Sequence, residues 1–175
     1  DSSIEQVRQE LMTKIGENIQ LRRVQTLETN SGSIGAYNHG DRIGVLVMLD
    51  QDNADLIKDM AMHVAASSPQ AIDATDIPED TIAREREIFT AQAKETGKPD
   101  DIIEKMVVGR INKFIKESCL VGQPFVKNPD QTVGSLLEAN KAKVLQFIRY
   151  EVGEGIEKQV QDFAAEVQAQ VEGSE

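Results

Sequence analysis

Cysteine and histidine are scarce in this 175-residue sequence, and their scarcity limits the chemistry that the chain can perform. Cys119 is the only cysteine, so no internal disulfide can form and a reducing compartment, the cytoplasm, is the predicted location. His39 and His63 are the only histidines, and neither belongs to a His-x-x-x-His or Cys-x-x-Cys metal-binding pattern. The P-loop pattern is also missing. We therefore expect no metal, no cofactor and no enzyme activity.

Long apolar runs are missing too, and so is an excess of positive charge. No run approaches the ~20 apolar residues that a membrane-spanning helix needs, so we expect no contact with a membrane. The net charge is −11. Such a charge argues against direct binding to nucleic-acid phosphates or to anionic lipid.

The most continuously apolar run that is present begins at Ile43, and its Val and Ile content predicts a buried strand at residues 42–49. Turn residues at 38–41 join it to a shorter predicted strand at 34–37. Alternation at residues 19–28 predicts a third strand, which would complete an antiparallel meander. The turn would present His39 at its tip, where rigid scaffolds often carry working residues.

Helical periodicity is found on both sides of these strands. Residues 81–96 and 101–118 have narrow apolar seams with heavily charged flanks, which predicts an antiparallel coiled-coil hairpin that projects from the body. The other predicted elements are helices at 3–15 (with a Ser3–Gln6 capping box), 53–68, from Thr132, and at 156–171, and strands at 122–126 and 144–152.

These elements predict an α+β fold, in which an antiparallel sheet subdomain with covering helices is interrupted by the helical hairpin. The expected core subdomain comprises residues 1–78 and 119–155. The hairpin is expected at residues 79–118, and a C-terminal helical module at 156–175.

Single residues that could take part in chemistry are better explained by structural roles. His63 is expected at the edge of a helix's apolar stripe, and Cys119 as a small apolar filler. The Gly153-Glu154-Gly155 sequence is interpreted as a turn, because it lacks the third glycine of a dinucleotide fingerprint and Glu154 would repel a phosphate. The residues by themselves indicate an acidic protein-interaction module, with self-association as an alternative.

Several motifs, in matching order, resemble the bacterial elongation factor Ts family. The resemblance covers nearly the whole chain. The clearest match is YNHGDRIGVLV at residues 37–47, which is similar to the family signature Y-x-H-x-x-R-I-G-V-L-V. The other matching segments are IGENI at 15–19 with Arg22 and Arg23, MAMHVAAS at 60–67, GQPFV at 122–126 and FIRYEVGEGIEK at 147–158.

The resemblance implies a function as well as a fold. It implies a guanine-nucleotide exchange factor of translation whose partner is the GTPase elongation factor Tu, and no catalytic residue is expected. Partner contacts are implied for Ile15, Gly16 and His39, with Tyr37, Asn38 and Gly40 in support. The C-terminal module is also implied to contact the partner.

The sequence departs from the family at one motif. Members of the family carry a T-D-F-V motif in a first core subdomain, after a small helical domain, and its Asp and Phe help to expel nucleotide. That motif does not occur here. We therefore interpret the chain as the C-terminal portion of such a factor, and expect it to bind the partner while promoting little exchange. A homodimer is a further possibility that the sequence leaves open.

Overall fold

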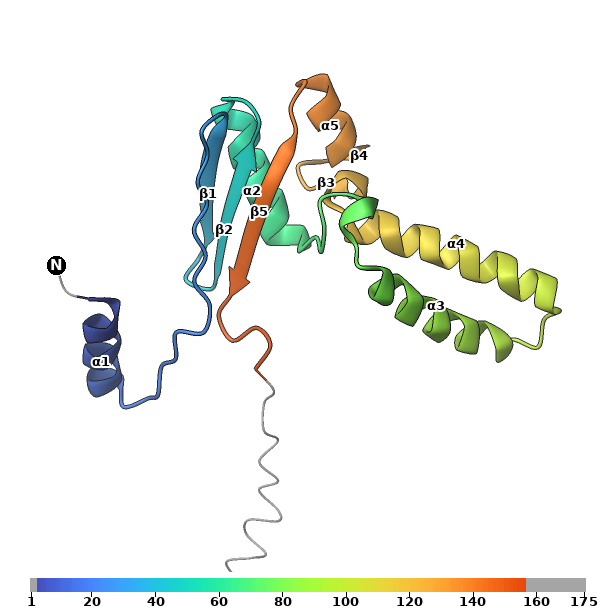
Figure 1. Cartoon of the computed structure of the whole chain (residues 1–175), viewed down its shortest axis with the longest axis horizontal. Helices are drawn as coiled ribbons and strands as arrows, with labels where there is room; N and C mark the ends of the chain where they lie inside the picture. The colour runs from blue at the N-terminus through green and yellow to red at the C-terminus, as the bar shows by residue number, and fades with distance from the viewer. Residues whose placement is uncertain (1–2, 157–175) are drawn as a thin grey trace, which may run out of the picture.

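The computed structural model describes residues 3–156, which form five α-helices, two short 3-10 helices and five strands (Figure 1). This mixture of helices and small antiparallel sheets agrees with the predicted α+β class. Among the described residues, no helix combines the length and apolar character that crossing a membrane requires. The predicted helix at 156–171 lies outside the described residues, apart from Ile156.

A three-stranded antiparallel sheet forms the body, in the order β1 (Ser33–His39), β2 (Ile43–Leu49) and β5 (Val144–Glu151). The predicted strand at residues 19–28 is wrong, because this segment is an extended coil without strand pairing. Leu21 and Val24 are 58% and 69% exposed. The alternation described the local character of the segment but not its pairing. The third strand of the sheet is β5, from far along the chain, and it lies on the other side of β2 from β1.

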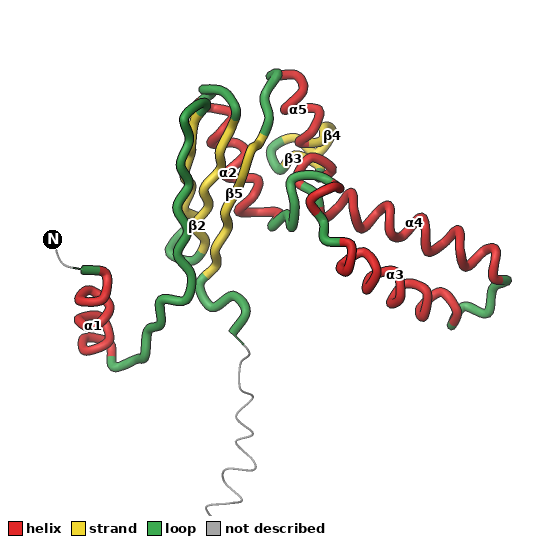
Figure 2. Tube along the Cα trace, viewed as in Figure 1, coloured by secondary structure: helices red, strands yellow, loops and turns green. Residues whose placement is uncertain are grey.

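Helix α2 (Ala54–Ser67) runs along one face of the sheet and buries its apolar side against it (Figure 2). Asn53 caps the helix as predicted, since its side-chain oxygen accepts a hydrogen bond from the backbone N–H of Leu56 at 3.1 Å. The helix lies close to β1 at Gly35. The core between the two layers includes Val45, Val47, Leu49, Leu56, Met60, Ala61 and Val64.

His63 lies inside this core, which corrects the expectation that it sits at the edge. The side chain is fully buried. Its Nδ1 accepts a hydrogen bond from the Val126 backbone N–H at 3.2 Å, so Nε2 carries the proton and donates to Gln123 Oε1 at 2.9 Å. Both ring nitrogens are therefore satisfied, and α2 is joined to the segment after residue 122. The helical periodicity could not reveal these partners, because both are distant in sequence.

Helices α3 (Glu79–Lys94) and α4 (Asp100–Ser118) pack against each other and project away from the sheet (Figure 1), which confirms the two helices predicted here. Their seam has its own apolar cluster, formed by Ala93, Ile103, Val107 and Ile111. A 3-10 helix, η1 (Ala74–Asp76), precedes α3.

A short subregion joins the hairpin to β5. It comprises the 3-10 helix η2 (Leu120–Gly122), the small sheet of β3 (Pro124–Phe125) and β4 (Asn128–Thr132), and helix α5 (Val133–Ala139). Thr132 caps α5, as predicted. The strand expected at 122–126 is shorter than predicted, because Gly122 belongs to η2.

Helix α1 (Ile4–Ile15) stands apart from the sheet (Figure 1). Its predicted capping box is present: Ser3 Oγ accepts from the Gln6 N–H and Gln6 Oε1 accepts from the Ser3 N–H. Its apolar stripe is exposed, however, and none of its residues is buried. The sequence pattern predicted the helix but not what its stripe contacts.

Candidate functional site

The predicted residues Tyr37, Asn38, His39 and Gly40 lie together at one end of the sheet. Asn38 pairs with Gly44, and His39 pairs with Ile43, so β1 continues through His39. His39 is therefore the last residue of the strand rather than the tip of the turn. The chain reverses at residues 40–42, where Gly40 adopts a positive φ of 56° that favours glycine. The pairing holds the exposed His39 on a regular scaffold.

Tyr37 connects His39 to the core. The Tyr37 side chain is half-buried and packs against the main apolar cluster. Its hydroxyl lies 3.2 Å from His39 Nδ1, and the two ring centroids are 6.2 Å apart. When the hydroxyl donates to Nδ1, the other ring nitrogen of His39 carries the proton and is free to donate to a partner.

The other two predicted residues, Ile15 and Gly16, form a separate group at the end of α1. Gly16 caps the helix with a φ of 75°, and its N–H donates to the Met12 carbonyl at 2.9 Å. Ile15 is 51% exposed. Within residues 3–156, no hydrogen bond joins this pair to the residue 37–40 group. The structure thus brings four of the predicted residues together and places two on another element.

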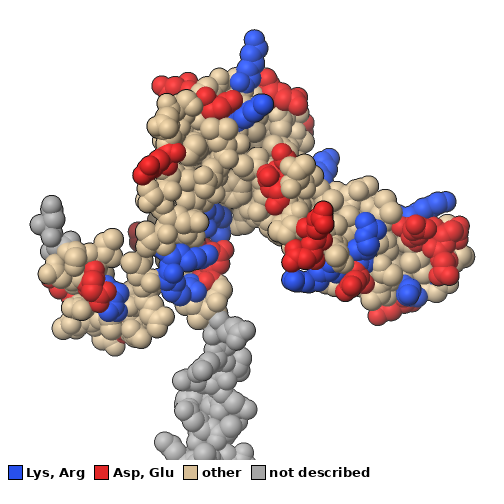
Figure 3. Space-filling model, in the orientation of Figure 1, with Lys and Arg blue, Asp and Glu red and all other residues tan. Residues whose placement is uncertain are grey.

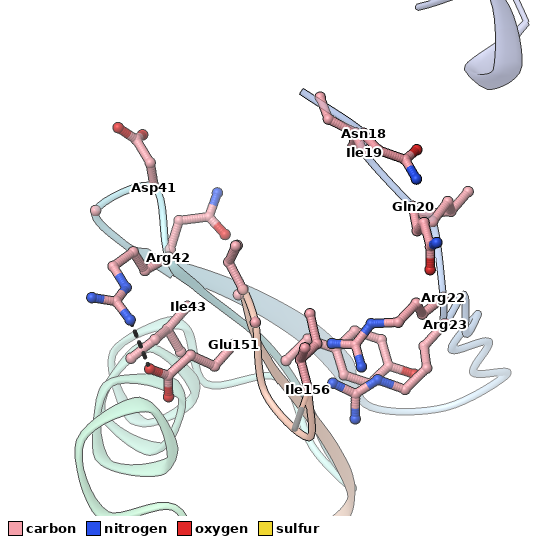
Figure 4. Close-up of a pocket in the computed structure, with 17 residues that line it drawn as sticks. Asn18, Ile19, Gln20, Arg22, Arg23, Asp41, Arg42, Ile43, Glu151 and Ile156 are labelled. Atoms are coloured by element: carbon pink, nitrogen blue, oxygen red, sulfur yellow. Dashed lines mark ion pairs between the residues drawn. The ribbon is translucent and has the colours of Figure 1, made fainter. Parts of the chain in front are cut away.

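A cleft of about 770 Å³ is lined in part by Asn38 and Gly40 and by the segment that begins at Asn18, two residues after Gly16 (Figure 4). One wall is the segment that follows Gly16, where Figure 4 shows Asn18, Ile19 and Gln20 across from Asp41 and Arg42 on the β1–β2 turn. The end of β5 and the residues after it form the floor. The full lining is Asn18, Ile19, Gln20, Leu21, Arg22, Arg23, Asn38, Gly40, Asp41, Arg42, Ile43, Gly44, Tyr150, Glu151, Val152, Gly153 and Ile156.

Arginines are concentrated around this cleft, although the chain as a whole is acidic. Figure 3 shows basic side chains beside acidic ones at this end of the sheet. Arg42 pairs with Glu151 at 3.6 Å, and the Arg23 guanidinium lies 4.4 Å from the centroid of the Tyr150 ring. The sequence-based site missed these residues. Arg22 and Arg23 are the only adjacent arginines in the sequence, which was the available signal.

The geometry suits recognition of a protein surface. The cleft is open and combines polar side chains with Ile19, Leu21 and Ile156. Within residues 3–156, no three His, Cys, Asp or Glu side chains are grouped so as to hold a metal ion. Cys119 is buried, as expected, and burial with the nearby charges of Asp73 and Asp76 raises the pKa of its thiol.

Comparison with known proteins identifies the family. The family model described as "Elongation factor TS" matches residues 1–154. The elongation factor Ts of Thioalkalivibrio sulfidiphilus (strain HL-EbGR7) is 56% identical over 174 residues, which are 99% of this chain and 59% of that protein. The elongation factor Ts of Methylococcus capsulatus is 56% identical over 173 residues, with the same coverage of both chains.

A third relative gives a similar result. The elongation factor Ts of Legionella pneumophila (strain Lens) is 56% identical over 170 residues, which are 97% of this chain and 58% of that protein. The chain thus spans less than two thirds of the length of the relatives that it matches. The family model and the identities to these relatives each cover most of the chain. They show that the chain belongs to the elongation factor Ts family of translation elongation factors.

Proposed function

We propose that this chain binds elongation factor Tu and acts as the partner-binding portion of a guanine-nucleotide exchange factor. The observation that carries the proposal is the exposed end of the β1–β2 hairpin, where strand pairing and the Tyr37 hydroxyl hold His39 in place. Membership of the elongation factor Ts family supports the same partner. A pre-positioned exposed group loses little freedom on binding, which favours affinity.

The proposed contact residues form the two groups described above. His39 is the proposed hydrogen-bonding contact of the hairpin, with Tyr37, Asn38 and Gly40 setting its position. Ile15 is the proposed apolar contact, and Gly16 ends α1 beside it so that the backbone stays accessible. Apolar side chains are common in the buried centre of protein interfaces, and a polar rim surrounds them.

The proposed mechanism is differential binding and involves no bond making. A factor that binds the nucleotide-free GTPase more tightly than the nucleotide-bound GTPase must lower the affinity for nucleotide by the same factor. No general acid, general base or cofactor takes part. The proposed location, in the cytoplasm, follows from this role in translation.

The domain boundaries are part of the proposal. Residues 1–78 with 119–155 form the core subdomain, residues 79–118 an inserted antiparallel coiled coil, and residues 156–175 a C-terminal module. The separate apolar cluster between α3 and α4 supports treating the hairpin as its own unit.

A binding measurement with nucleotide-free elongation factor Tu tests the function. Immobilised partner is titrated with the unaltered chain, with His39→Ala and with Gln146→Ala, a matched control for an exposed polar side chain of β5. We expect His39→Ala to bind about tenfold more weakly, as is common when a central interface side chain is truncated. The control should bind like the unaltered chain. Equal binding by His39→Ala would show that the hairpin end is ordinary surface.

Two further readouts use the same preparations. We expect the chain to accelerate GDP release little, because the T-D-F-V motif does not occur in it; a rate like that of a full-length factor would contradict this. The alternative function, self-association, is favoured by Ile34, which is exposed on the sheet face opposite α2. Light scattering after size-exclusion chromatography, with and without the partner, distinguishes a complex from a homodimer.

A further inference from the structure

The position of α1 relative to the sheet depends on few contacts. The helix has no buried residue, so apolar packing does not hold it in place. Within the described residues 3–156, the hydrogen bonds that join residues 3–28 to later parts of the chain come from Arg22 and Arg23. Both arginines meet the same residue, Glu154. These two bonds, together with the contact of Arg23 with the Tyr150 ring, join the segment that carries Ile15 and Gly16 to the end of the sheet.

Arg8 makes α1 and the following segment one unit. Its Nη1 donates to the Ile19 carbonyl at 2.8 Å, while its Nε and Nη2 bind the Glu5 carboxylate at 2.8 and 2.6 Å. The helix is thus tied to residue 19. Only Gln20 and Leu21 separate Ile19 from the arginine pair, so a shift at Arg22 is transmitted to α1.

Glu154, three residues after the end of β5, binds this unit. Arg22 Nη2 donates to the Glu154 carbonyl at 2.6 Å, and Arg23 Nη2 lies 2.9 Å from Glu154 Oε2. Arg149 Nη1 lies 3.5 Å from the other carboxylate oxygen, Oε1. The bond to Arg23, together with the charges of Arg23 and Arg149, lowers the pKa of Glu154, so its carboxylate stays charged at neutral pH.

Arg149, which contacts Glu154, is itself held by several groups. The Arg149 side chain is only 12% exposed. It also binds Glu151 at 2.9 Å, and its Nε lies 3.4 Å from the Ala65 carbonyl of α2. Glu154 is thus connected through Arg149 to the strand β5 and to the core helix. Its turn is closed by its own N–H, which donates to the Glu151 carbonyl at 3.1 Å.

We propose that Glu154 is a positioning residue for partner binding: it anchors the Arg22–Arg23 segment to the end of β5 and so sets the separation between Ile15–Gly16 and His39. This inference rests on the proposed function for its consequence, but not for its geometry. Without the anchor, α1 samples several positions, and the fraction of molecules with both contact groups correctly placed falls. The apparent affinity for the partner falls by the same fraction.

The test measures the position of α1 directly. Spin labels are attached to Glu10→Cys on α1 and Lys58→Cys on α2, two exposed sites, in a Cys119→Ala background. Pulsed electron paramagnetic resonance then gives the distribution of distances between the two spin labels. We expect a narrow distribution with Glu154 intact and a broader one in Glu154→Gln, which weakens the side-chain contact to Arg23 and keeps the backbone carbonyl that Arg22 binds. Glu138→Gln, which removes the same charge from an exposed site on α5, is the matched control and should stay narrow.

Binding to nucleotide-free elongation factor Tu is measured on the same variants without labels. We expect Glu154→Gln to bind about three- to tenfold more weakly, with unchanged circular dichroism. Arg23→Gln should cause less loss when it is added to Glu154→Gln than when it is made alone, because the Arg23–Glu154 contact is already broken and only the contact of Arg23 with the Tyr150 ring remains to be lost. A distribution as narrow in Glu154→Gln as in Glu138→Gln would overturn the inference. If the distribution broadens in Glu154→Gln but the unaltered chain does not bind elongation factor Tu, the proposed function is contradicted. The role of Glu154 in positioning α1 is then still supported.

Discussion

His63 is a polar residue whose burial makes stability depend on pH. Its ring is fully buried between α2 and the segment after residue 122, and the Nδ1 lone pair is already used by the Val126 N–H. Burial disfavours the charged imidazolium and lowers the pKa of His63, and the bond to Gln123 only partly opposes this. Protonation would also place a second N–H against the Val126 donor.

The sign of the pH effect follows from this lowered pKa. Between the ordinary pKa of 6.5 and the lower folded-state value, the unfolded chain binds a proton that the folded chain does not. The contribution of neutral His63 to the free energy of unfolding is therefore complete above pH 6.5 and falls as the pH is lowered below it. We expect the free energy of unfolding to decrease by up to about 1.4 kcal/mol per pH unit in this window.

Urea denaturation at pH 7.5 and pH 5.0 measures the effect. In His63→Gln the free energy of unfolding should differ less between the two pH values, because the titrating group is gone. Gln146→Ala, at an exposed site without a titratable group, is the control and should retain the full difference. An unchanged pH dependence in His63→Gln would show that other groups cause it.

At the scale of elements, β1 and α2 approach each other closely at Gly35. A Cβ added at Gly35 would lie 2.9 and 3.0 Å from Ile57 Cγ1 and Cγ2, which is tighter than real side chains allow. Glycine is therefore required here by the closeness of the two layers. Gly109 in α4 contrasts with it, since an added Cβ would meet no atom within 4 Å.

The same substitution should have opposite effects at these two glycines. We expect Gly35→Ala to lower the free energy of unfolding by about 1–3 kcal/mol, because Ile57 and the strand must separate. Gly109→Ala should raise it by about 0.5–1 kcal/mol, because alanine restricts the unfolded chain and favours a helix. Chemical denaturation of both variants checks this, and a neutral Gly35→Ala would mean that α2 can shift at little cost.

At the scale of the whole molecule, the apolar cluster of the body is separate from the apolar cluster of the hairpin. The main cluster lies between the sheet and α2, while the hairpin cluster lies between α3 and α4. A third, small cluster of Ala71, Ile77 and Cys119 lies at the base of the hairpin, with Ile82 and Ile115 packed against it. Leu120 N–H donates to the Ala71 carbonyl at 2.9 Å and closes this base.

Shortening the hairpin should therefore leave the body folded. We expect replacement of residues 84–113 by a short Gly/Ser linker to preserve amide exchange protection in β2, because Ile82, Ile115 and the base cluster remain. Exchange measured by mass spectrometry, with the unaltered chain as reference, tests this. Loss of protection in β2 would show that the hairpin and the body form one cooperative unit, and would contradict the proposed boundary at residues 79–118.

Local sequence patterns determined most helices and the central strand. The caps at Ser3, Asn53 and Thr132 involve partners three residues away, so spacing alone predicts them. The apolar run in β2 likewise predicts burial without knowledge of its neighbours. The family was also recognisable from the motifs, because side-chain identities and their order are properties of the sequence.

Tertiary structure decided which segments meet. The third strand of the sheet is β5 rather than residues 19–28, and His63 lies inside the core, bonded to Gln123. Glu154 binds Arg23 from 131 positions away. Such pairings depend on loop closure between distant segments, and no local periodicity encodes them. The sequence by itself thus determined the elements and the family, while the relation of α1 to the His39 hairpin exists only in the folded chain.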